Sequence, residues 1–225
     1  MKIAVLGTGM VGRTLAVRLT ELGHSVTVGT RDPQSTLGRT ERDPMGGEPY
    51  AAWARQNPAV ALAAFADAAR GAELIVNATN GASSLDVLAQ AGAENLAGKV
   101  LVDIANPLEF GQGMPPTLFV KDTDSLGEQI QRAYPEARVV KTLNTLNADL
   151  MTHPEKLPEP STVFVSGNDA DAKEAVTALL AEFGHRDVID LGDMTTARGT
   201  EMLLPVWLRL WGALGTPEFN FKIVR

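Results

Sequence analysis

Short, almost uninterrupted apolar runs alternate with longer amphipathic segments along the first two thirds of the chain. Apolar runs without regular polar positions are typical of strands buried on both faces, as in parallel sheets. They predict strands at residues 3–6, 26–28, 74–77, 100–104 and 139–142. The amphipathic segments predict helices at 13–22, at 50–70 with an interruption at Pro58, at 83–91 and at 125–133. Because parallel strands need right-handed crossovers, this alternation predicts a doubly wound α/β sheet of the Rossmann type.

The last third of the chain continues the alternation in a shorter form. Strands are expected at 162–166 and 188–191, with a helix at 170–183 between them. A long helix at about 196–214, kinked at Pro205, and an apolar segment at 219–224 follow. These segments predict a small C-terminal α/β extension that ends in a long apolar helix.

A glycine-rich turn joins the first strand to the first helix and predicts a nucleotide site. Gly7-Thr8-Gly9-Met10-Val11-Gly12 has the GxGxxG spacing, directly after an apolar strand and before a helical segment. In this arrangement the first glycine allows a tight turn, the second lets the backbone approach a pyrophosphate, and the third lets helix and strand pack closely. We therefore expect the pyrophosphate of a dinucleotide at the N-terminus of the first helix.

The residues that follow the second strand distinguish between the two nicotinamide dinucleotides. NAD-binding sites usually place an acid here for the ribose 2′-hydroxyl, whereas this chain has Thr30 and Arg31. A guanidinium binds a 2′-phosphate through paired charge-assisted hydrogen bonds, and a hydroxyl adds another. The sequence therefore predicts NADP(H) as the cofactor. The alternative is that Arg31 is a solvated loop residue and that Asp32 is the ribose ligand.

Composition narrows the classes of protein that fit. The 225 residues suit one large domain, or one domain with a small appendage. The chain has no cysteine, which excludes disulfides and thiolate chemistry, and its first apolar run is too short for a signal sequence or a membrane span. We therefore expect a cytoplasmic protein. The net charge of −7 argues against nucleic acid and membranes as partners.

Histidines and loops add little chemistry of their own. His24 and His185 each follow a glycine at a predicted helix end, and His153 stands alone, so neither a metal site nor a histidine base is expected.

Residues 33–49 are expected to form a loop over the adenosine end of the site. Residues 107–124 are expected to form a second loop over the nicotinamide end, where they are a candidate lid.

The whole chain resembles the coenzyme F420-dependent NADP oxidoreductases, which pair NADPH with a 5-deazaflavin. The glycine-rich turn, Val28-Gly29-Thr30-Arg31, Asn77-Ala78-Thr79, Lys141-Thr142-Leu143-Asn144-Thr145, and Thr196-Ala197-Arg198 with Glu201 carry this resemblance. The family implies reversible hydride transfer between NADPH and coenzyme F420 in a cleft between two parts of the chain. On this view residues 1–145 form the NADP-binding Rossmann domain. Residues 146–225 complete the acceptor cleft and a dimer interface.

The resemblance also implies which residues flank the two ligands. Those expected beside the ribose and nicotinamide, at the carboxyl ends of parallel strands, are Ala78, Thr79, Ile104, Ala105 and Asn106. Those expected to face the junction of the two rings are Asn144, Leu146, Asn147 and Ala148. The chain departs from better-known members here, since they have His in place of Asn144 and Ile-Pro in place of Leu146-Asn147. No nucleophile is needed, because hydride transfer between stacked rings depends on positioning.

Several candidates on the acceptor side also have a structural interpretation. Asn144 and Asn147 follow a strand, where asparagine often caps turns and helices. Arg198 and Glu201 are three residues apart, so they share a helix face and can form an exposed ion pair with each other. Lys141 lies within a strand pattern rather than on a helix, and we do not expect it to be a catalytic lysine.

The last predicted helix is apolar on more than one face. This apolar surface is larger than a single contact within the chain can bury. Its large apolar residues are Met202, Leu203, Trp207, Leu208, Leu210, Trp211 and Leu214. A homodimer interface is the simplest explanation, and an aromatic platform for the deazaflavin is the alternative.

Two other functions fit the predicted nucleotide site. One is an NADPH-dependent reductase of another small substrate, such as an imine, a flavin or a carbonyl compound. Imine and hydroxyacid reductases need a long helical domain after about residue 165, where only about 60 residues remain in this chain. The other is a non-catalytic NADP(H)-sensing protein.

Overall fold

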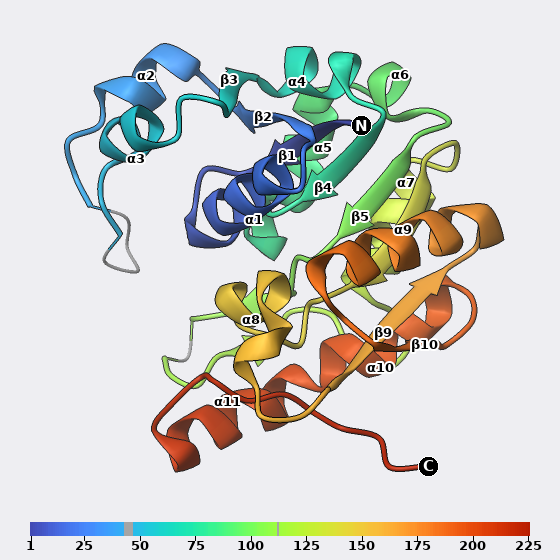
Figure 1. Cartoon of the computed structure of the whole chain (residues 1–225). Coiled ribbons are helices and arrows are strands. Elements are labelled where there is room, and N and C mark those ends of the chain that lie inside the picture. The colour runs from blue at the N-terminus through green and yellow to red at the C-terminus, as the bar shows by residue number, and fades with distance from the viewer. Residues whose placement is uncertain (43–46, 112) are drawn as a thin grey trace.

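The computed structural model describes residues 1–42, 47–111 and 113–225. Over these residues the larger sheet has eight strands in the order β10-β9-β8-β5-β4-β1-β2-β3 (Figure 1). Its strands are β1 (Lys2–Leu6), β2 (Ser25–Thr30), β3 (Ala61–Ala64), β4 (Leu74–Asn77), β5 (Val100–Asp103), β8 (Arg138–Thr142), β9 (Thr162–Gly167) and β10 (Asp187–Asp190). Six strands run parallel, while β9 pairs antiparallel with β8 and parallel with β10. The predicted, mainly parallel Rossmann-type sheet is confirmed.

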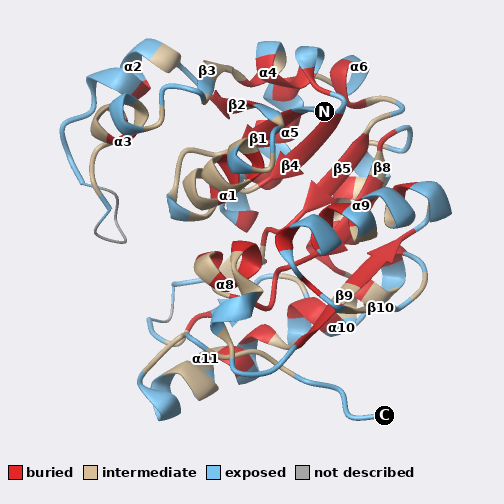
Figure 2. Ribbon diagram, in the orientation of Figure 1, coloured by how far each residue is buried: buried red, intermediate tan, exposed pale blue. Residues whose placement is uncertain are grey.

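Helices cover both faces of this sheet. They are α1 (Met10–Glu21), α2 (Pro33–Gly38), α3 (Tyr50–Gln56), α4 (Phe65–Gly71), α5 (Ser84–Ala91), α6 (Ala93–Leu96), α7 (Leu126–Ala133), α8 (Ala148–Thr152), α9 (Ala170–Phe183), α10 (Ala197–Met202) and α11 (Leu204–Leu214). Along β1, Ile3 and Val5 pack in a core shared with α1 and α9, whereas Ala4 and Leu6 pack in a second core with α4 and α5. The central strands are accordingly buried (Figure 2). Burial on both faces explains why the strand sequences are unbroken apolar runs.

The predicted helix at 50–70 with an interruption at Pro58 is only partly confirmed, because a strand lies between its two helical parts. The chain instead forms α3, then strand β3, and then α4. Pro58 follows the end of α3, where its missing N–H and fixed φ oppose continuation of the helix. The alanine-rich stretch then pairs with β2, with Ala61 opposite Thr27 and Ala64 opposite Thr30. Pairing with a sheet edge thus overrides the helix propensity of alanine.

Both predicted loops contain regular structure. Helix α2 lies within 33–49, and the Asp32 carboxylate caps it by accepting hydrogen bonds from the amides of Gln34 at 2.9 Å and Ser35 at 3.2 Å. Within 107–124, β6 (Leu108–Glu109) pairs antiparallel with β7 (Thr117–Leu118). Residues 43–46 and 112 of these two stretches lie outside the described residues. The expected roles of both stretches beside a ligand stay predictions.

The last predicted helix is divided into α10 and α11 at Leu203. Pro205 lies in the first turn of α11 and has no N–H to donate to the preceding turn. Hydrogen bonds continue on either side, since the amide of Leu203 donates to the carbonyl of Gly199 at 3.1 Å and that of Trp207 donates to Leu203 at 2.9 Å. A break is therefore found close to the predicted kink.

The C-terminal part of the chain extends the same sheet through β9 and β10. The apolar segment at 219–224 forms no strand, although the amide of Thr162 donates to the carbonyl of Phe221 at 2.9 Å. This bond holds the end of the chain beside the start of β9. The division into domains at residue 145 stays a prediction.

Candidate functional site

The glycine-rich turn draws the ends of three strands together. Gly7 has a left-handed φ of 126°, and its amide donates to the carbonyl of Gly29, in β2, at 3.1 Å. A Cβ atom on Gly7 would lie 2.5 Å from the carbonyl oxygen of Ala78, after β4. A Cβ atom on Gly12 would lie 2.2 Å from the carbonyl oxygen of Gly7. Any side chain at either position would force the backbone apart, which explains the two glycines.

The N-terminus of α1 is an uncapped, positive helix end. Gly9 is the N-cap residue and offers no side chain, and the first turn carries no acid. The first amides of a helix lack partners within it and form the positive end of its dipole. Thr8 and Val11 are partly buried beside this end, while Met10 is exposed. The arrangement fits the pyrophosphate of a dinucleotide.

Thr30, Arg31 and Asp32 have distinct surroundings at the end of β2. The hydroxyl of Thr30 is buried and lies 2.8 Å from the hydroxyl of Thr36. Arg31 is exposed. The carboxylate of Asp32 is held on α2 by the two backbone amides that it caps. This geometry favours Arg31 over Asp32 as the residue that meets a substituent on the ribose.

The exits of β4 and β5 form the adjoining part of the edge. Thr79 is partly buried, and its hydroxyl donates to Oδ1 of Asn77 at 2.7 Å. Asn106 is also partly buried. A Cβ atom on Gly81 would lie 2.0 Å from the carbonyl oxygen of Asn106, so the two exit loops touch. The residues expected beside ribose and nicotinamide thus share one edge of the sheet: Ala78, Thr79, Ile104, Ala105 and Asn106.

Asn144 joins the exit of β5 to helix α10. Its side-chain amide donates to Oδ1 of Asn106 at 3.0 Å and to the carbonyl of Thr200 at 3.1 Å. The side chain of Asn106 donates in return to the carbonyl of Asn144 at 2.8 Å. The preceding residue, Leu143, is buried with a φ of 57°, a conformation that is rare for a bulky side chain. Such strain persists only where surrounding contacts fix it, and it is common at functional sites.

The other residues expected at the ring junction begin helix α8. Asn147 is its N-cap residue, because Oδ1 accepts from the amide of Leu150 at 2.9 Å. Nδ2 of the same side chain donates to the carbonyl of Pro217 at 2.5 Å. Leu146 and Ala148 are buried. The capping interpretation of Asn147 is confirmed, while the contacts of these residues with an acceptor stay a prediction.

The predicted ion pair between Arg198 and Glu201 is wrong. Each of the two side chains binds other residues instead. Arg198 binds Glu128 on α7, with Nε–Oε2 at 2.8 Å and Nη2–Oε1 at 2.6 Å. Hydrogen bonding from this guanidinium holds the pKa of Glu128 below its usual value. The buried Glu201 carboxylate accepts from the amides of Leu126 at 2.8 Å and Gly127 at 3.0 Å. Both side chains tie α10 to the start of α7.

A buried network that the sequence alone did not predict lies beneath this edge. Nζ of Lys141 lies 2.8 Å from Oδ2 of Asp103 and 2.9 Å from Oε1 of Glu201, and it donates to the carbonyl of Ala105. Asp103 also accepts from Nδ2 of Asn77 at 2.8 Å. Burial by itself lowers the pKa of Lys141, but the two carboxylates outweigh it and raise that pKa above its usual value.

The sequence did carry a signal for this network. Asn77, Asp103 and Lys141 each interrupt an apolar run near its carboxyl end. The sheet register places Asn77 opposite Asp103 and Asp103 opposite Lys141. Since polar groups in buried strands are rarely left unpaired, these three could have been predicted as a cluster. Glu201 lies on a distant helix and gave no such signal.

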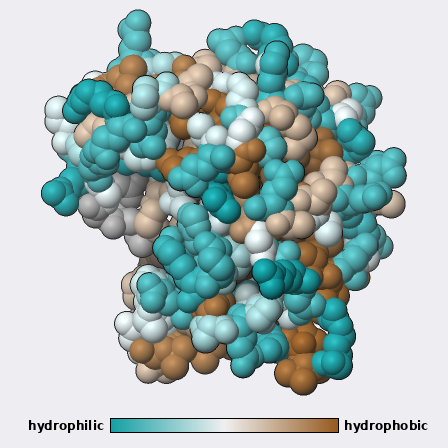
Figure 3. Space-filling view, in the orientation of Figure 1, coloured by the Kyte–Doolittle hydropathy of each residue, from teal (hydrophilic) through white to brown (hydrophobic). Residues whose placement is uncertain are grey.

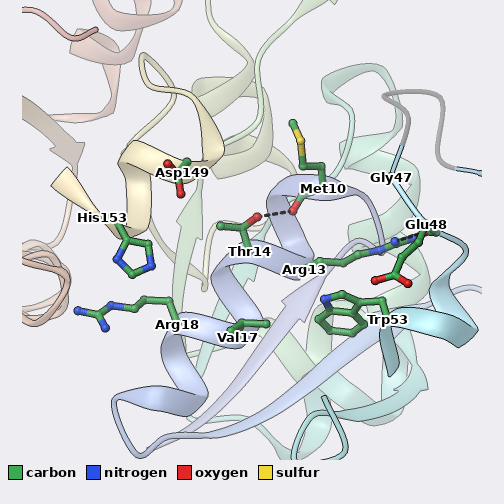
Figure 4. Close-up of a pocket in the computed structure, with 10 residues that line it drawn as sticks. All are labelled: Met10, Arg13, Thr14, Val17, Arg18, Gly47, Glu48, Trp53, Asp149 and His153. Carbon is green, nitrogen blue, oxygen red and sulfur yellow. Dashed lines mark hydrogen bonds between the residues drawn. The ribbon is translucent and has the colours of Figure 1, made fainter. Parts of the chain in front are cut away.

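A pocket of about 370 Å³ lies on the outer side of α1 (Figure 4). Met10 and Arg13 line it from α1, Trp53 from α3, and Asp149 and His153 from the region of α8. The strand ends described above are not among its lining residues. Met10 also belongs to the glycine-rich turn, so the pocket adjoins the predicted nucleotide site.

The histidines occupy the turns expected of them. Gly184 ends α9 with a left-handed φ of 104°, and the buried His185 follows it. Among residues 1–42, 47–111 and 113–225, no group of three or more His, Asp or Glu side chains is placed to hold a metal ion. No helix formed by these described residues has the length and apolar character that crossing a membrane requires.

Several comparisons with known proteins indicate one family. The family model described as "NADP oxidoreductase coenzyme F420-dependent" matches residues 2–107. A crystal structure of a candidate F420-dependent NADP-reductase from Arthrobacter sp. FB24 is 67% identical, with a TM-score of 0.96 and coverage of 100% of both chains. This match extends the likeness from residues 2–107 to the whole chain.

Two curated relatives are more distant. The F420-dependent NADP reductase of Methanocaldococcus jannaschii is 28% identical, over 93% of this chain and 92% of that protein. The metalloreductase STEAP3 of Rattus norvegicus is 30% identical over 92% of this chain, which spans only 38% of the length of that protein. With the fold, the glycine-rich turn and the full-length match to the Arthrobacter structure in agreement, the chain belongs to the family of coenzyme F420-dependent NADP oxidoreductases.

Proposed function

We propose that this protein transfers a hydride reversibly between NADPH and coenzyme F420. The observation that carries this proposal is the uncapped N-terminus of α1 beside the exposed Arg31, in a chain 67% identical over its full length to a candidate F420-dependent NADP-reductase. The positive helix end fits a pyrophosphate, and the guanidinium fits the 2′-phosphate that distinguishes NADP from NAD.

The residues of the strand edge divide between the two ends of the dinucleotide. The residues proposed to hold its phosphates are Gly7, Thr8, Gly9, Met10, Val11, Gly12, Thr30 and Arg31. Those proposed to flank its ribose and nicotinamide are Ala78, Thr79, Ile104, Ala105, Asn106 and Ala148. When bound, NADPH supplies the hydride and the deazaflavin accepts it. The side chains around them orient the two rings and exclude water, and they need no acid or base for the transfer itself.

The candidates on the acceptor side differ in how much of each side chain reaches the surface. Asn147 and Arg198 are partly exposed, so they can contact an acceptor directly. Asn144, Leu146 and Glu201 are buried, and we propose that they shape this side of the cleft from behind.

A second candidate function is the reduction of another small acceptor. The likeness to the metalloreductase STEAP3 favours it, because that protein is 30% identical over 92% of this chain and carries the name of a different reductase. A flavin, an imine or a carbonyl compound would then replace the deazaflavin as the acceptor. The nucleotide site would keep the same role.

Turnover with a panel of acceptors separates these functions. The purified protein is mixed with NADPH and, in separate reactions, with oxidised coenzyme F420, free flavins and imines, and the loss of NADPH absorbance is followed. Rapid oxidation with F420 alone supports the proposal. Faster turnover with a flavin or an imine favours the second candidate. Tight NADPH binding without turnover of any acceptor would leave a non-catalytic NADP(H) sensor and contradict both enzyme functions.

We also propose that the protein is a cytoplasmic homodimer that associates through α10 and α11. Met202, Val206 and Leu214 expose apolar side chains along these helices, and Met114 lies beside a groove lined by α11. Figure 3 shows apolar side chains gathered over α11 at the lower edge of the molecule. A second copy would bury them. The cysteine-free sequence fits a reducing compartment.

A further inference from the structure

Lys141 lies at the centre of a charge cluster that has no direct part in the proposed reaction. The side chains of Lys141 and Asp103 are fully buried, and that of Glu201 is 1% exposed. None of the three reaches the surface where a ligand would bind. Any effect of this cluster on the reaction must therefore pass through neighbouring residues.

A continuous chain of hydrogen bonds runs from Lys141 along the carboxyl ends of β8, β5 and β4. Oδ1 of Asp103 accepts from Nδ2 of Asn77 at 2.8 Å and from the amide of Ala105 at 3.2 Å. Oδ1 of Asn77 accepts from the hydroxyl of Thr79 at 2.7 Å. Lys141 itself donates to the carbonyl of Ala105. One buried cluster thus fixes the backbone of Ala105 and the side chain of Thr79.

Glu201 connects the same cluster to α10. The carbonyl of the preceding Thr200 accepts from Asn144, whose side chain and backbone exchange hydrogen bonds with Asn106. Helix α10 therefore supports the exit of β5 through Asn144 and Asn106. The residues on both sides of this exit are held by bonds that lead back to Lys141.

We infer that Lys141 and Asp103 are positioning residues for hydride transfer, which hold Thr79 and Ala105 where the ribose and nicotinamide bind; this inference rests on the proposed function. Buried ion pairs contribute little net stability, because removing charges from water is costly. A fully bonded buried network does, however, fix one arrangement of the groups around it. Hydride transfer depends steeply on that arrangement, since a displacement of about 1 Å can cost about 100-fold in rate.

Asp103→Asn tests this inference without unbalancing the buried charges. The substitution keeps the size of the side chain and leaves Lys141 paired with Glu201. An amide accepts on one side only, so it cannot accept from both Lys141 and Asn77, and the chain of bonds is cut. Asp190→Asn is the matched control, because Asp190 forms an ion pair with Lys173 at the end of β10, away from the site.

We expect kcat to fall about 10- to 100-fold in Asp103→Asn, because the nicotinamide end of the site loses its fixed geometry. The Kd for NADP⁺ should change less than about threefold, since the contacts of α1 and Arg31 with the phosphates are untouched. The isotope effect with NADPH deuterated at the transferred position should rise, because hydride transfer becomes slower than product release. A merely structural role would lower the amount of folded enzyme and leave the isotope effect unchanged.

Hydrogen exchange supplies a readout that needs no turnover. The amide of Ala105 and the amides of residues 77–84 should exchange faster in Asp103→Asn than in the wild type, and at the wild-type rate in Asp190→Asn. Unchanged exchange in folded Asp103→Asn, or a kcat equal to that of the wild type, would overturn the inference. If the wild type turns over no acceptor, the proposed function fails, and the exchange measurement still decides whether Asp103 fixes these loops.

Discussion

Asp103 and Lys141 face each other across the neighbouring parallel strands β5 and β8, with Oδ2 and Nζ 2.8 Å apart and both side chains fully buried. Glu201 adds a second carboxylate, so one positive and two negative charges share a site sealed from water. The amides of Leu126 and Gly127 donate to Glu201 and offset part of the excess negative charge. Each charge is therefore tolerated because it has its own partners.

Removal of the single positive charge is expected to destabilise the fold strongly. Lys141→Met should lower the free energy of unfolding by about 3–5 kcal/mol, because Asp103 and Glu201 would face each other without a cation. Adding Glu201→Gln to this variant should recover part of the loss, since only one carboxylate would remain unpaired. Urea denaturation of the wild type and the two variants measures these differences.

Lys156→Met is the control for losing a lysine ion pair. Lys156 is exposed and pairs with Asp149 on α8. Exposed pairs contribute little, so this variant should lose less than about 1 kcal/mol. Equal losses in Lys141→Met and Lys156→Met would contradict the role of burial in the larger effect.

Arg31 is expected to determine the preference for NADPH over NADH. Arg31→Ala should weaken NADPH binding about 10- to 100-fold, because hydrogen bonds to a charged group contribute about 1.5–3 kcal/mol. The affinity for NADH should stay unchanged, since NADH has no 2′-phosphate. Fluorescence titration with both nucleotides measures the two constants.

Arg55→Ala, at the end of α3, is the control for this measurement because it also removes one exposed arginine. It should leave both affinities unchanged. If Arg31→Ala also leaves both unchanged, Arg31 is a solvated residue and Asp32 becomes the candidate for the ribose.

The hydrophobic pattern predicted most of the sheet because its strands are buried on both faces. Strand β3 escaped prediction since Ala61–Ala64 has no β-branched residue and only one large apolar residue, Leu62, and its pairing with β2 is what makes it a strand. That pairing is a tertiary contact, which a local window of sequence does not contain. Helix α2 was missed for a different reason, since its start carries a local signal, in which Asp32 is the N-cap residue and Pro33 follows it.

The candidate site also contains residues that local sequence predicts and residues that it does not. The close backbone contacts at Gly7 and Gly12 could be predicted because they depend on spacing within one strand–turn–helix unit. Asn144 could be proposed only from the family resemblance, since its partners Asn106 and Thr200 come from distant parts of the chain. Sequence spacing therefore predicts contacts within one such unit better than contacts between distant parts of the chain.

Gly81 is expected to be needed for the contact between the exits of β4 and β5. Gly81→Ala would place a methyl group 2.0 Å from the carbonyl oxygen of Asn106, and rigid backbone atoms must then move. Overpacking of this kind costs about 1–3 kcal/mol, and we expect kcat to fall as well because Asn106 is displaced. Thermal unfolding and steady-state kinetics measure the two effects.

Gly71→Ala is the matched control, because a Cβ atom at the end of α4 would meet nothing within 4 Å. This variant should stay within about 0.5 kcal/mol of the wild type and keep its kcat. Gly81→Ala with the stability and turnover of Gly71→Ala would show that the two exit loops are not in tight contact.

His185 is expected to make stability depend on pH in the mildly acidic range. Its ring is buried with Nε2 2.9 Å from the carbonyl oxygen of Met151, and burial lowers its pKa. The unfolded chain binds a proton at about pH 6.5, whereas the folded chain keeps the ring neutral. This contribution to stability is therefore complete above that pH and is lost as the pH falls toward the lower pKa of the folded state.

His185→Gln removes this titration and keeps an N–H group that can donate to Met151. Urea midpoints measured from about pH 7.5 to about pH 5 should fall more steeply for the wild type than for the variant. Parallel curves for the two proteins would mean that His185 is protonated equally in the folded and unfolded states.

The exposed apolar side chains of α11 are expected to hold two copies of the chain together. Val206 is 50% exposed and Leu214 is 56% exposed. In Val206→Glu, each copy would bring a carboxylate into the apolar contact, so the dissociation constant of the dimer should rise more than about tenfold. Analytical ultracentrifugation over a range of concentrations measures this constant. Val224→Glu is the matched control, because Val224 is 88% exposed near the end of the chain and should leave the dimer intact. A wild type that stays monomeric at micromolar concentrations would instead leave this surface free for the alternative role, a platform for the acceptor.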